Sequence, residues 1–347
     1  MKQPQPQPYR DGQQRSFWQR LVAFANIVYE PRQHLLFAAL WFLSIQGLFV
    51  LNSPATTWHW NITTLISAGS FFGVLFVLRA IDEVKDLEYD RQYNPERPLV
   101  SGVVSLTDIR HYVVLGTLLI ALANGLIAWP LALFVVLNIG YGLLLMLLEK
   151  ALPLMERSLF FNLLLTYPVS IALSVYTLLQ IRFTQQVDVV VCLLPIILCY
   201  ILAFLHFEII RKSMWEPLAD PGEKLYSNEI GCRQALLLGS LCGVLAIAGI
   251  MMLNRPWHLN GAAAITGWLP LLNLIWIGLS LKLFLTRQTQ RFNPRQYSVP
   301  FIVSFYLLNL VHTSVANSIQ WSWTLAVGMV PEWIGFEWIR PEWIAAI

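Results

Sequence analysis

Charged residues are scarce in this sequence of 347 residues. Only 12% are Asp, Glu, Lys or Arg, about half the roughly 25% found in soluble domains. The apolar share is 56%, there are 14 Trp, and the mean hydropathy is +0.58. This balance excludes an ordinary soluble domain and predicts an integral membrane protein whose main partner is the lipid bilayer. We expect no nucleic-acid partner, and no obligatory protein partner can be read from the composition.

Cysteine is scarce as well. The four cysteines, at positions 192, 199, 232 and 242, show no Cys-x-x-Cys spacing. This spacing argues against a zinc or redox site and favours packing as small apolar side chains.

The N-terminal segment does not predict a cleavable signal. Residues 1–16 are polar and contain Gln-Pro repeats, so we expect a disordered tail. Residues 17–29 mix apolar and polar side chains and suit a helix in the membrane interface, before Pro31 starts the first span. We expect a membrane domain over 17–324 and a Trp-rich tail over 325–347, in which Glu-Trp-Ile recurs at 332, 337 and 342.

Apolar runs near the length that crosses about 30 Å of hydrocarbon recur along the chain. They predict an all-α fold, a polytopic membrane protein with nine transmembrane helices. The predicted spans are 35–51, 62–81, 112–129, 131–148, 158–180, 188–210, 234–253, 262–284 and 300–323.

Basic residues are distributed unevenly between the two sides of this bundle. Of 23 Lys and Arg residues, 20 lie in the N-terminal segment, in the connections after spans two, four, six and eight, or within two residues of the ends of spans two and eight (Arg79 and Lys282). The other three are Arg182, Arg255 and Arg340. Because basic connections stay in the cytoplasm, the N-terminus is predicted to be cytoplasmic and the C-terminus to lie on the opposite side.

Three aspartates, Asp82, Asp86 and Asp90, stand four residues apart where the second span ends. On a helix, a step of four rotates by about 40° and climbs about 6 Å, so the carboxylates form one acidic ridge on the cytoplasmic side. Lys85 and Arg91 offset part of their repulsion, and a divalent cation would offset far more. Mg²⁺ shared between carboxylates and phosphate oxygens is the usual arrangement. A magnesium-diphosphate site is therefore the leading hypothesis, and a merely solvated helix end is the alternative.

Two further charged segments are predicted on the same side. After the ridge, two prolines stiffen the segment Arg97-Pro98-Leu99-Val100-Ser101-Gly102, which would hold the Arg97 guanidinium in place for a phosphate. The sixth span ends in a second cluster: Glu208, Arg211, Lys212, Glu216 and Asp220. Since Pro217 disfavours a continuous helix, Glu216 and Asp220 are not assigned to one helical face.

These motifs resemble those of the UbiA superfamily of intramembrane prenyltransferases. That family has nine helices, an Asn-Asp-x-x-Asp-x-x-x-Asp motif after helix two, an Arg-Pro-Leu-x-x-Gly segment, and a second acidic motif after helix six. Here the first motif reads Asp82-Glu83-x-x-Asp86-x-x-x-Asp90, and the second segment begins at Arg97. The resemblance implies a UbiA-like bundle in which these carboxylates, Glu83 included, bind Mg²⁺ on an isoprenyl diphosphate.

The chain departs from the family pattern after helices four and six. Of the family's Tyr-x-x-x-Lys, Lys150 is present and Met146 replaces the tyrosine. The second motif becomes Glu208-x-x-Arg211-Lys212, with two carboxylates displaced downstream. The sequence thus looks like a divergent branch whose acceptor does not follow from the family.

The resemblance and the charges together imply roles for these residues. Arg97, Lys150, Arg211 and Lys212 are expected to stabilise the departing diphosphate. Glu216 and Asp220 are candidate metal ligands and Glu208 a candidate substrate contact, with a solvated loop as an equal alternative for all three. Polar groups inside spans usually face the bundle interior, so Asn162, His206 and His312 are expected to line a cavity or to serve as bonded structural groups. Aromatic side chains on spans five, six and nine are candidates for stabilising an allylic cation: Phe160, Phe161, Tyr167, Phe204, Phe207, Tyr306 and Trp321.

Three functions remain open from the sequence. The leading one is prenyl transfer to a lipid-soluble, aromatic acceptor, and the second is terpene cyclisation, which needs the same ionisation and no acceptor. The third is transport. The carboxylates argue against it, because they lie at the ends of spans, whereas a transport site is usually near the midplane of the bilayer.

Overall fold

The computed structural model describes residues 15–53, 57–185, 193–215, 218–220, 223–286 and 293–323. Cys192, Glu216, nearly all of the expected N-terminal tail and the expected Trp-rich C-terminal tail lie outside the described residues. The expected domain boundaries therefore stay predictions.

Within the described residues, nine helical segments are long and apolar enough to cross a membrane, which confirms the predicted count. The main helices are α2 (Pro31–Leu51), α3 (Ile62–Lys85), α5 (Leu106–Gly125), α6 (Trp129–Ala151), α8 (Leu159–Gln185), α9 (Leu194–Arg211), α11 (Cys232–Asn254), the pair α12 (Gly261–Gly267) and α13 (Leu274–Thr286), and α14 (Ser298–Ala316). Short helices join them: α4 (Leu87–Tyr93), α7 (Pro153–Arg157), α10 (Tyr226–Ile230) and the 3-10 turns η4 (Pro256–His258), η5 (Leu269–Asn273) and η6 (Pro294–Tyr297).

The predicted interfacial segment is helical, as α1 (Phe17–Phe24) followed by a π-helical turn η1 (Ala25–Tyr29). Ser16 caps α1, and Arg20 forms two hydrogen bonds with Asp108, at 2.9 and 2.8 Å, that hold α1 against α5. Trp18 is 68% exposed on the other side of α1. One face of this helix thus packs on the bundle and one stays free, which is the division an interfacial helix needs.

The eighth span is interrupted. The sequence predicts one helix over 262–284, whereas the chain runs through α12, the 3-10 turn η5 and α13. Pro270 lies in η5, and it lacks the backbone N–H that would continue an α-helical ladder. The Asn273 side chain also donates to the Pro270 carbonyl at 3.0 Å, a further contact within the turn η5.

A two-stranded parallel sheet is an addition to the predicted all-α fold. Strand β1 (Thr57–Trp60) pairs with β2 (Ser318–Trp321), in the register Thr57 to Ser318. The ninth span, predicted to reach 323, therefore ends as a helix at Ala316. Trp58 anchors the sheet, because its indole is fully buried and donates to Gln46 at 3.0 Å, and Gln46 in turn donates to Gln180 at 2.6 Å.

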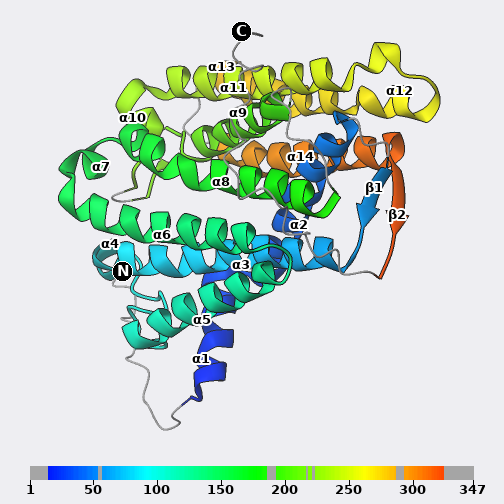
Figure 1. Cartoon of the computed structure of the whole chain (residues 1–347). Helices are drawn as coiled ribbons and strands as arrows, with labels where there is room; N and C mark the ends of the chain where they lie inside the picture. The colour runs from blue at the N-terminus through cyan, green and yellow to red at the C-terminus, as the bar shows by residue number, and fades with distance from the viewer. Residues whose placement is uncertain are drawn as a thin grey trace, which may run out of the picture.

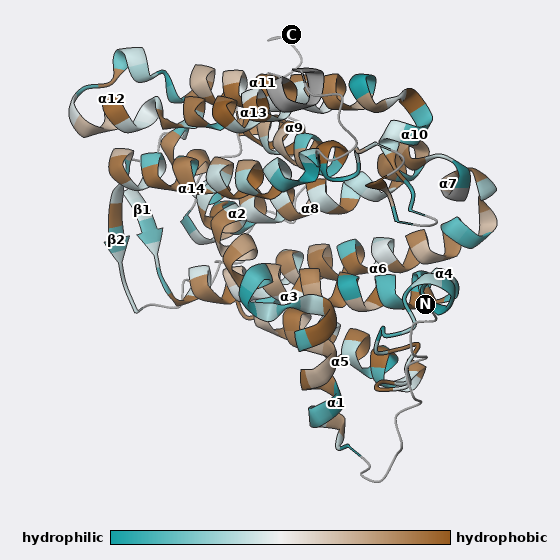
Figure 2. Ribbon diagram, turned by 180° about the vertical axis from the view of Figure 1, so that it is seen from behind, coloured by the Kyte–Doolittle hydropathy of each residue, from teal (hydrophilic) through white to brown (hydrophobic). Residues whose placement is uncertain are grey.

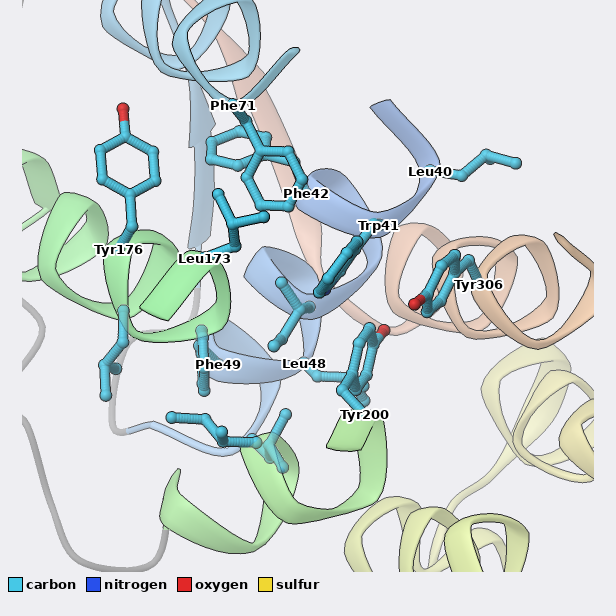
Figure 3. Close-up of a cluster of buried hydrophobic side chains, with 14 of the residues drawn as sticks. Leu40, Trp41, Phe42, Leu48, Phe49, Phe71, Leu173, Tyr176, Tyr200 and Tyr306 are labelled. Carbon is cyan, nitrogen blue, oxygen red and sulfur yellow. The ribbon is translucent and has the colours of Figure 1, made fainter. Parts of the chain in front are cut away.

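Helix α2 lies within the aromatic core shown in Figure 3. Trp41 of α2 stacks on Tyr306 of α14 at 5.8 Å between ring centroids, and Tyr306 stacks on Tyr200 of α9 at 5.4 Å. Close approach of α2 and α14 depends on Gly47, because a Cβ there would lie 2.4 Å from the Thr313 hydroxyl. The core thus joins the first and last spans of the chain.

The two ends of the bundle differ in character. Helices α4, α7 and α10 gather at one end, on the left in Figure 1, whereas β1, β2 and α12 lie at the other. In Figure 2 the long helices are largely brown (apolar), and α4 is teal (polar). We refer to the end that carries α4, α7 and α10 as the acidic end, because α4 follows Asp82 and Asp86 directly.

Candidate functional site

The acidic ridge predicted after the second span is broken at its middle residue. Helix α3 ends at Lys85 and α4 begins at Leu87, with Asp86 between them at φ −85° and ψ 2°. Two backbone hydrogen bonds with the four-residue spacing of an α-helix still cross the junction. The Asp86 N–H donates to the Asp82 carbonyl at 2.8 Å, and the Asp90 N–H donates to the Asp86 carbonyl at 2.9 Å. The two helices therefore stay joined, but they are not one regular helix with a single face.

Asp82 and Asp86 remain together, around the ammonium of Lys85. Its Nζ lies 3.6 Å from Asp82 Oδ1, 4.0 Å from Asp86 Oδ1 and 3.5 Å from Oε2 of Glu149 on α6. The Asp82 and Asp86 side chains are 45% and 43% exposed. Partial burial of the Asp86 carboxyl raises its pKa above the ordinary value of an aspartate, and the positive charge of Lys85 opposes that rise.

Asp90 is separated from the other two aspartates. It is only 4% exposed, and its carboxylate accepts a hydrogen bond from the Asn94 side chain at 2.7 Å. Asp90 thus helps to close the end of α4, and its assignment as a metal ligand stays a prediction.

Glu83 forms a buried ion-pair cluster. Its Oε1 lies 3.1 Å from an Arg79 nitrogen and 2.9 Å from an Arg97 nitrogen, and its side chain is 1% exposed. The predicted phosphate ligand Arg97 is therefore bound to Glu83, and through this contact the segment after α4 is held against α3. Within the part of the chain that the structure describes, the buried Glu83 Oε2 has no hydrogen-bond partner. The assignment of Glu83 to the metal stays a prediction, and its ion pairs also give it a structural role.

An inner cavity of about 350 Å³ lies among α2, α3, α6, α8 and α9. Charged groups and apolar side chains share its wall. The charged and polar lining residues are His34, Arg79, Asp82, Lys85, Glu149, Asn162, Thr166, Tyr167, Ser170, Glu208 and Lys212, and the apolar ones include Leu75, Leu78, Leu145, Leu163 and Phe204.

A larger outer cavity, of about 970 Å³, adjoins it at the acidic end. Lys85, Glu149, Asn162, Leu163, Thr166, Glu208 and Lys212 line both cavities. The outer wall adds Asp86, Tyr89, Tyr93, Lys150, Arg211, Glu223, Lys224, Tyr226 and Arg295. The predicted cations Lys150, Arg211 and Lys212 thus surround one space, although they come from α6 and from the end of α9.

The second cluster predicted from the sequence is centred on Glu208. Arg211 lies 2.6 Å and Lys212 2.8 Å from the Glu208 carboxylate, whose side chain is 10% exposed. The Arg211 guanidinium also stands 5.5 Å from the centroid of the Phe207 ring. Since two cations compensate one carboxylate, this wall presents excess positive charge to the cavities.

The other predicted site residues divide into lining and non-lining groups. Asn162 lines both cavities and donates to the Met155 carbonyl at 3.3 Å. His206 is buried, its Nδ1–H donates to the Gly239 carbonyl at 2.8 Å, and its ring packs on Phe301, so it occupies a packing position among the helices. Asp220 is exposed in the loop after α9, where its N–H donates to Glu223.

Aromatic rings form part of the inner wall. Tyr167 and Phe204 line the cavity, and Phe204 stacks on Trp41 with 5.7 Å between ring centroids. Trp41 continues into the stack with Tyr306 and Tyr200 (Figure 3). Of the predicted aromatic candidates, Tyr167 and Phe204 are therefore placed to face a ligand in this cavity, and Tyr306 lies behind them.

The donor chemistry at the acidic end suits a hard divalent cation. Asp82, Asp86 and Glu149 offer carboxylate oxygens. Among the described residues, the buried Glu149 Oε2 has no contact within hydrogen-bond distance, and Lys85 Nζ stands 3.5 Å from it. Among the residues the structure describes, no three His, Cys, Asp or Glu side chains are already closed on one metal position. Mg²⁺ commonly takes one or two carboxylates and fills its shell with water and phosphate oxygens, so these residues fit Mg²⁺ held jointly with a diphosphate.

Three residues at this site were not assigned a role from the sequence. Arg79 and His34 line the inner cavity, and Glu149 approaches Lys85 from another helix. Arg79 carried a usable signal, since a charged residue inside a span usually faces the bundle interior. His34 and Glu149 lie at helix ends, where the sequence does not show which helix packs beside them.

Comparison with known proteins gives a match in fold. No family model matches the chain, and no curated protein matches its sequence. A solved structure described as the apo form of a UbiA homolog from Aeropyrum pernix K1 matches with a TM-score of 0.57 and 16% identity, over 82% of this chain and 98% of that one. A structure of digeranylgeranylglyceryl phosphate synthase matches with a TM-score of 0.56 and 17% identity, over 85% and 98%. The expected UbiA-like fold is thereby confirmed: this chain shares the fold of these two solved structures.

Proposed function

We propose that the protein is a membrane-embedded prenyltransferase, which ionises an isoprenyl diphosphate with Mg²⁺ and transfers the prenyl group to a lipid-soluble, aromatic acceptor. The observation that carries this proposal is the pair of adjoining cavities. The inner cavity is lined by three carboxylates and several cations near the ends of α3, α6 and α9 at the acidic end. Its apolar residues Leu75, Leu78, Leu145 and Phe204 come from earlier turns of the same helices. An isoprenyl diphosphate has the same division, with a highly charged head and an apolar chain.

The charged groups supply what the head requires. Asp82 and Asp86 would hold Mg²⁺, which would neutralise part of the diphosphate charge. Arg79, Lys85 and Lys212 reach the inner cavity, and Lys150 and Arg211 the outer one. Positive groups preorganised around a leaving group stabilise the charge that develops on it. Arg97 acts from outside these linings, by pairing with Glu83.

The reaction is a substitution at the first carbon of the prenyl chain. The carbon–oxygen bond breaks, the electron pair leaves with the diphosphate, and an allylic cation remains. The acceptor then donates an electron pair to that carbon and loses one proton, so atoms and charge balance. The faces of Tyr167 and Phe204 are suited to stabilising the cation while it lasts.

A second candidate is cyclisation of the same substrate without an acceptor. The altered second motif favours it, because Glu208 is already paired with Arg211 and Lys212 and differs from a free acidic motif. Transport ranks last. Asp82 and Asp86 stand at the end of α3 and not at the bilayer midplane, where transported ions are usually bound.

The deciding experiment incubates purified protein and Mg²⁺ with prenyl diphosphates of different chain length, with and without a lipid extract, and measures diphosphate release and organic products. Prenyl transfer predicts release that depends on the extract. Release with a hydrocarbon product and no extract would indicate a cyclase. No release with any donor would contradict both enzymes and favour transport.

We further propose that the acidic end faces the cytoplasm. The support is the distribution of Lys and Arg, since basic connections are retained on that side. Soluble diphosphates and Mg²⁺ would then reach the outer cavity directly from the aqueous phase.

A further inference from the structure

The ammonium of Lys85 occupies an unusual position among the ion pairs of the acidic end. It faces three carboxylates at 3.5, 3.6 and 4.0 Å, contributed by Glu149, Asp82 and Asp86. All three distances exceed the 2.7–2.9 Å of a strong charge-assisted hydrogen bond. By contrast, Glu208 binds its own cations at 2.6 and 2.8 Å. Lys85 is thus centred between its partners and docked on none of them.

The position of Lys85 also places it beside the substrate path. Its side chain is 20% exposed and lines both the inner and the outer cavity. A ligand that fills the two cavities must therefore contact it. The lysine side chain is a flexible four-carbon stem carrying three donors, so the ammonium can move without a change in the backbone.

Charge balance shows what such a ligand would change. Within 4.0 Å, one ammonium faces three carboxylates, so two negative charges among these four groups remain uncompensated. Arg79 also acts on Asp86, but its guanidinium is paired with Glu83 at 3.1 Å. A divalent cation would compensate the two negative charges, but it would share its position with the ammonium and repel it. The two cations are therefore alternatives at one set of oxygens.

We infer that Lys85 is the resident counter-ion of Asp82, Asp86 and Glu149, that a divalent metal ion displaces its ammonium, and that the displaced ammonium then binds the diphosphate. This inference rests on the proposed function for the identity of the anion, and on the geometry alone for the competition with metal. It assigns Lys85 two effects of opposite sign: it weakens binding of the metal alone and strengthens binding of the diphosphate.

The first test measures binding of Mn²⁺, as a probe for Mg²⁺, to the purified full-length protein without diphosphate, by the loss of the free-ion electron paramagnetic resonance signal. Lys85→Met should bind Mn²⁺ about tenfold more tightly than the wild type, the low end of what a charge within 4–6 Å does to a neighbouring cation site. Lys85→Gln provides a second neutral variant in case one of them fails to fold. Lys85→Arg keeps the charge and should retain the wild-type affinity.

A matched control removes a positive charge from the adjoining helix. Arg91 on α4 pairs with Glu88 at 2.8 Å and does not line either cavity. Arg91→Met should therefore leave Mn²⁺ binding within about twofold of the wild type, because its partner is not one of the three carboxylates. Equal tightening in Arg91→Met and Lys85→Met would show a general effect of charge and overturn the inference.

The second test measures binding of inorganic diphosphate at saturating Mn²⁺. Lys85→Met should bind it about tenfold more weakly than the wild type, the reverse of its effect on the metal. A variant that binds both the metal and diphosphate less tightly would identify Lys85 as a purely structural residue. Unchanged Mn²⁺ binding in both neutral variants would also overturn the inference.

The inference and the proposed function can fail separately. If diphosphate release from prenyl donors needs metal while the Lys85 variants bind Mn²⁺ like the wild type, only the inference about Lys85 is wrong. If Lys85→Met gains Mn²⁺ affinity and the protein releases no diphosphate from any donor, the counter-ion role holds and the proposed reaction does not.

Discussion

At the scale of single residues, neighbouring acidic side chains have different surroundings and therefore different expected tasks. Asp86 is close to half exposed and faces a cavity, whereas Asp90 is buried and hydrogen-bonded to Asn94. Glu83 is buried between two arginines. A motif that appears uniform in the sequence is thus divided into a ligand-facing part and a part that holds the backbone.

The first prediction compares two aspartates of the motif. Asp86→Asn should abolish metal-dependent diphosphate release, because it removes a charged oxygen ligand from the cavity wall. Asp90→Asn should lower release by only about tenfold, through disturbed positioning of the end of α4. Steady-state release in membranes with matched expression measures both. A larger loss in Asp90→Asn than in Asp86→Asn would reverse this assignment.

The second prediction concerns the ion-pair cluster at Glu83. Glu83→Ala should lower the free energy of unfolding by about 2 kcal/mol, somewhat below the 3–5 kcal/mol typical of a fully buried pair, since Arg79 and Arg97 are partly exposed. Thermal unfolding in detergent measures the change. Glu88→Ala is the control, because Glu88 is 84% exposed and its pair with Arg91 is expected to contribute under about 1 kcal/mol. An equal loss of unfolding free energy in the two variants would show that the buried ion pairs of Glu83 stabilise the protein no more than the exposed pair of Glu88.

Many residues of the site could be predicted from the sequence, but the ion pairs between them could not. The spacing of Asp82 and Asp86 and the side chain of Asn162 led to groups that do line the cavities. The contacts of Glu149 with Lys85 and of Arg97 with Glu83 cross between segments. Local periodicity carries no information on which residues of two packed segments meet, so these partners required the structure.

At the scale of elements, the closeness of helices is set by small side chains at their crossings. Gly47 of α2 lies against Thr313 of α14 and against the Trp58 ring. An added methyl group would meet atoms at 2.4 to 2.9 Å, so the helices would have to separate or the tryptophan would have to move. This crossing also supports the sheet, because Trp58 belongs to β1.

The third prediction follows from that crossing. Gly47→Ala should destabilise the protein by about 2 kcal/mol, within the range for overpacking a tight core. Gly140→Ala on α6 should cost nothing or stabilise slightly, since its Cβ would meet no atom within 4 Å and alanine favours the helix. Unfolding temperatures of the two variants in the same detergent measure this difference. Similar temperatures would show that the crossing of α2 and α14 has room for an added methyl group.

Element positions were predictable where hydropathy decides them. All nine spans were located, with ends that differ by up to seven residues from the helical segments. The break in the eighth span and the strands β1 and β2 were not anticipated. Pro270 is tolerated inside many membrane helices, and Thr-Trp-His-Trp becomes a strand only because a distant segment pairs with it.

At the scale of the whole molecule, the two ends of the bundle should face different compartments. The acidic end carries the outer cavity, and the opposite end carries the sheet. The basic connections predict that the acidic end is cytoplasmic. The orientation determines which compartment supplies the diphosphate.

The fourth prediction tests this orientation with single cysteines in a variant lacking the four native ones. Gln320→Cys on β2 should react with a membrane-impermeant maleimide in intact cells, whereas Gln92→Cys on α4 should react only after lysis. Both positions are exposed, so access to the reagent is comparable. The reverse labelling pattern would place the acidic end outside the cytoplasm.

The pairing of β1 with β2 also bears on the order in which the protein assembles. Thr57 meets Ser318, so about 260 residues of chain must be synthesised after the first strand before its partner exists. At a synthesis rate of 5–20 residues per second this takes tens of seconds. During this time the segment that becomes β1, with Trp58, has no partner strand. The bundle is completed only when its last helix is inserted, and until then the first loop lacks the strand with which it pairs in the finished protein.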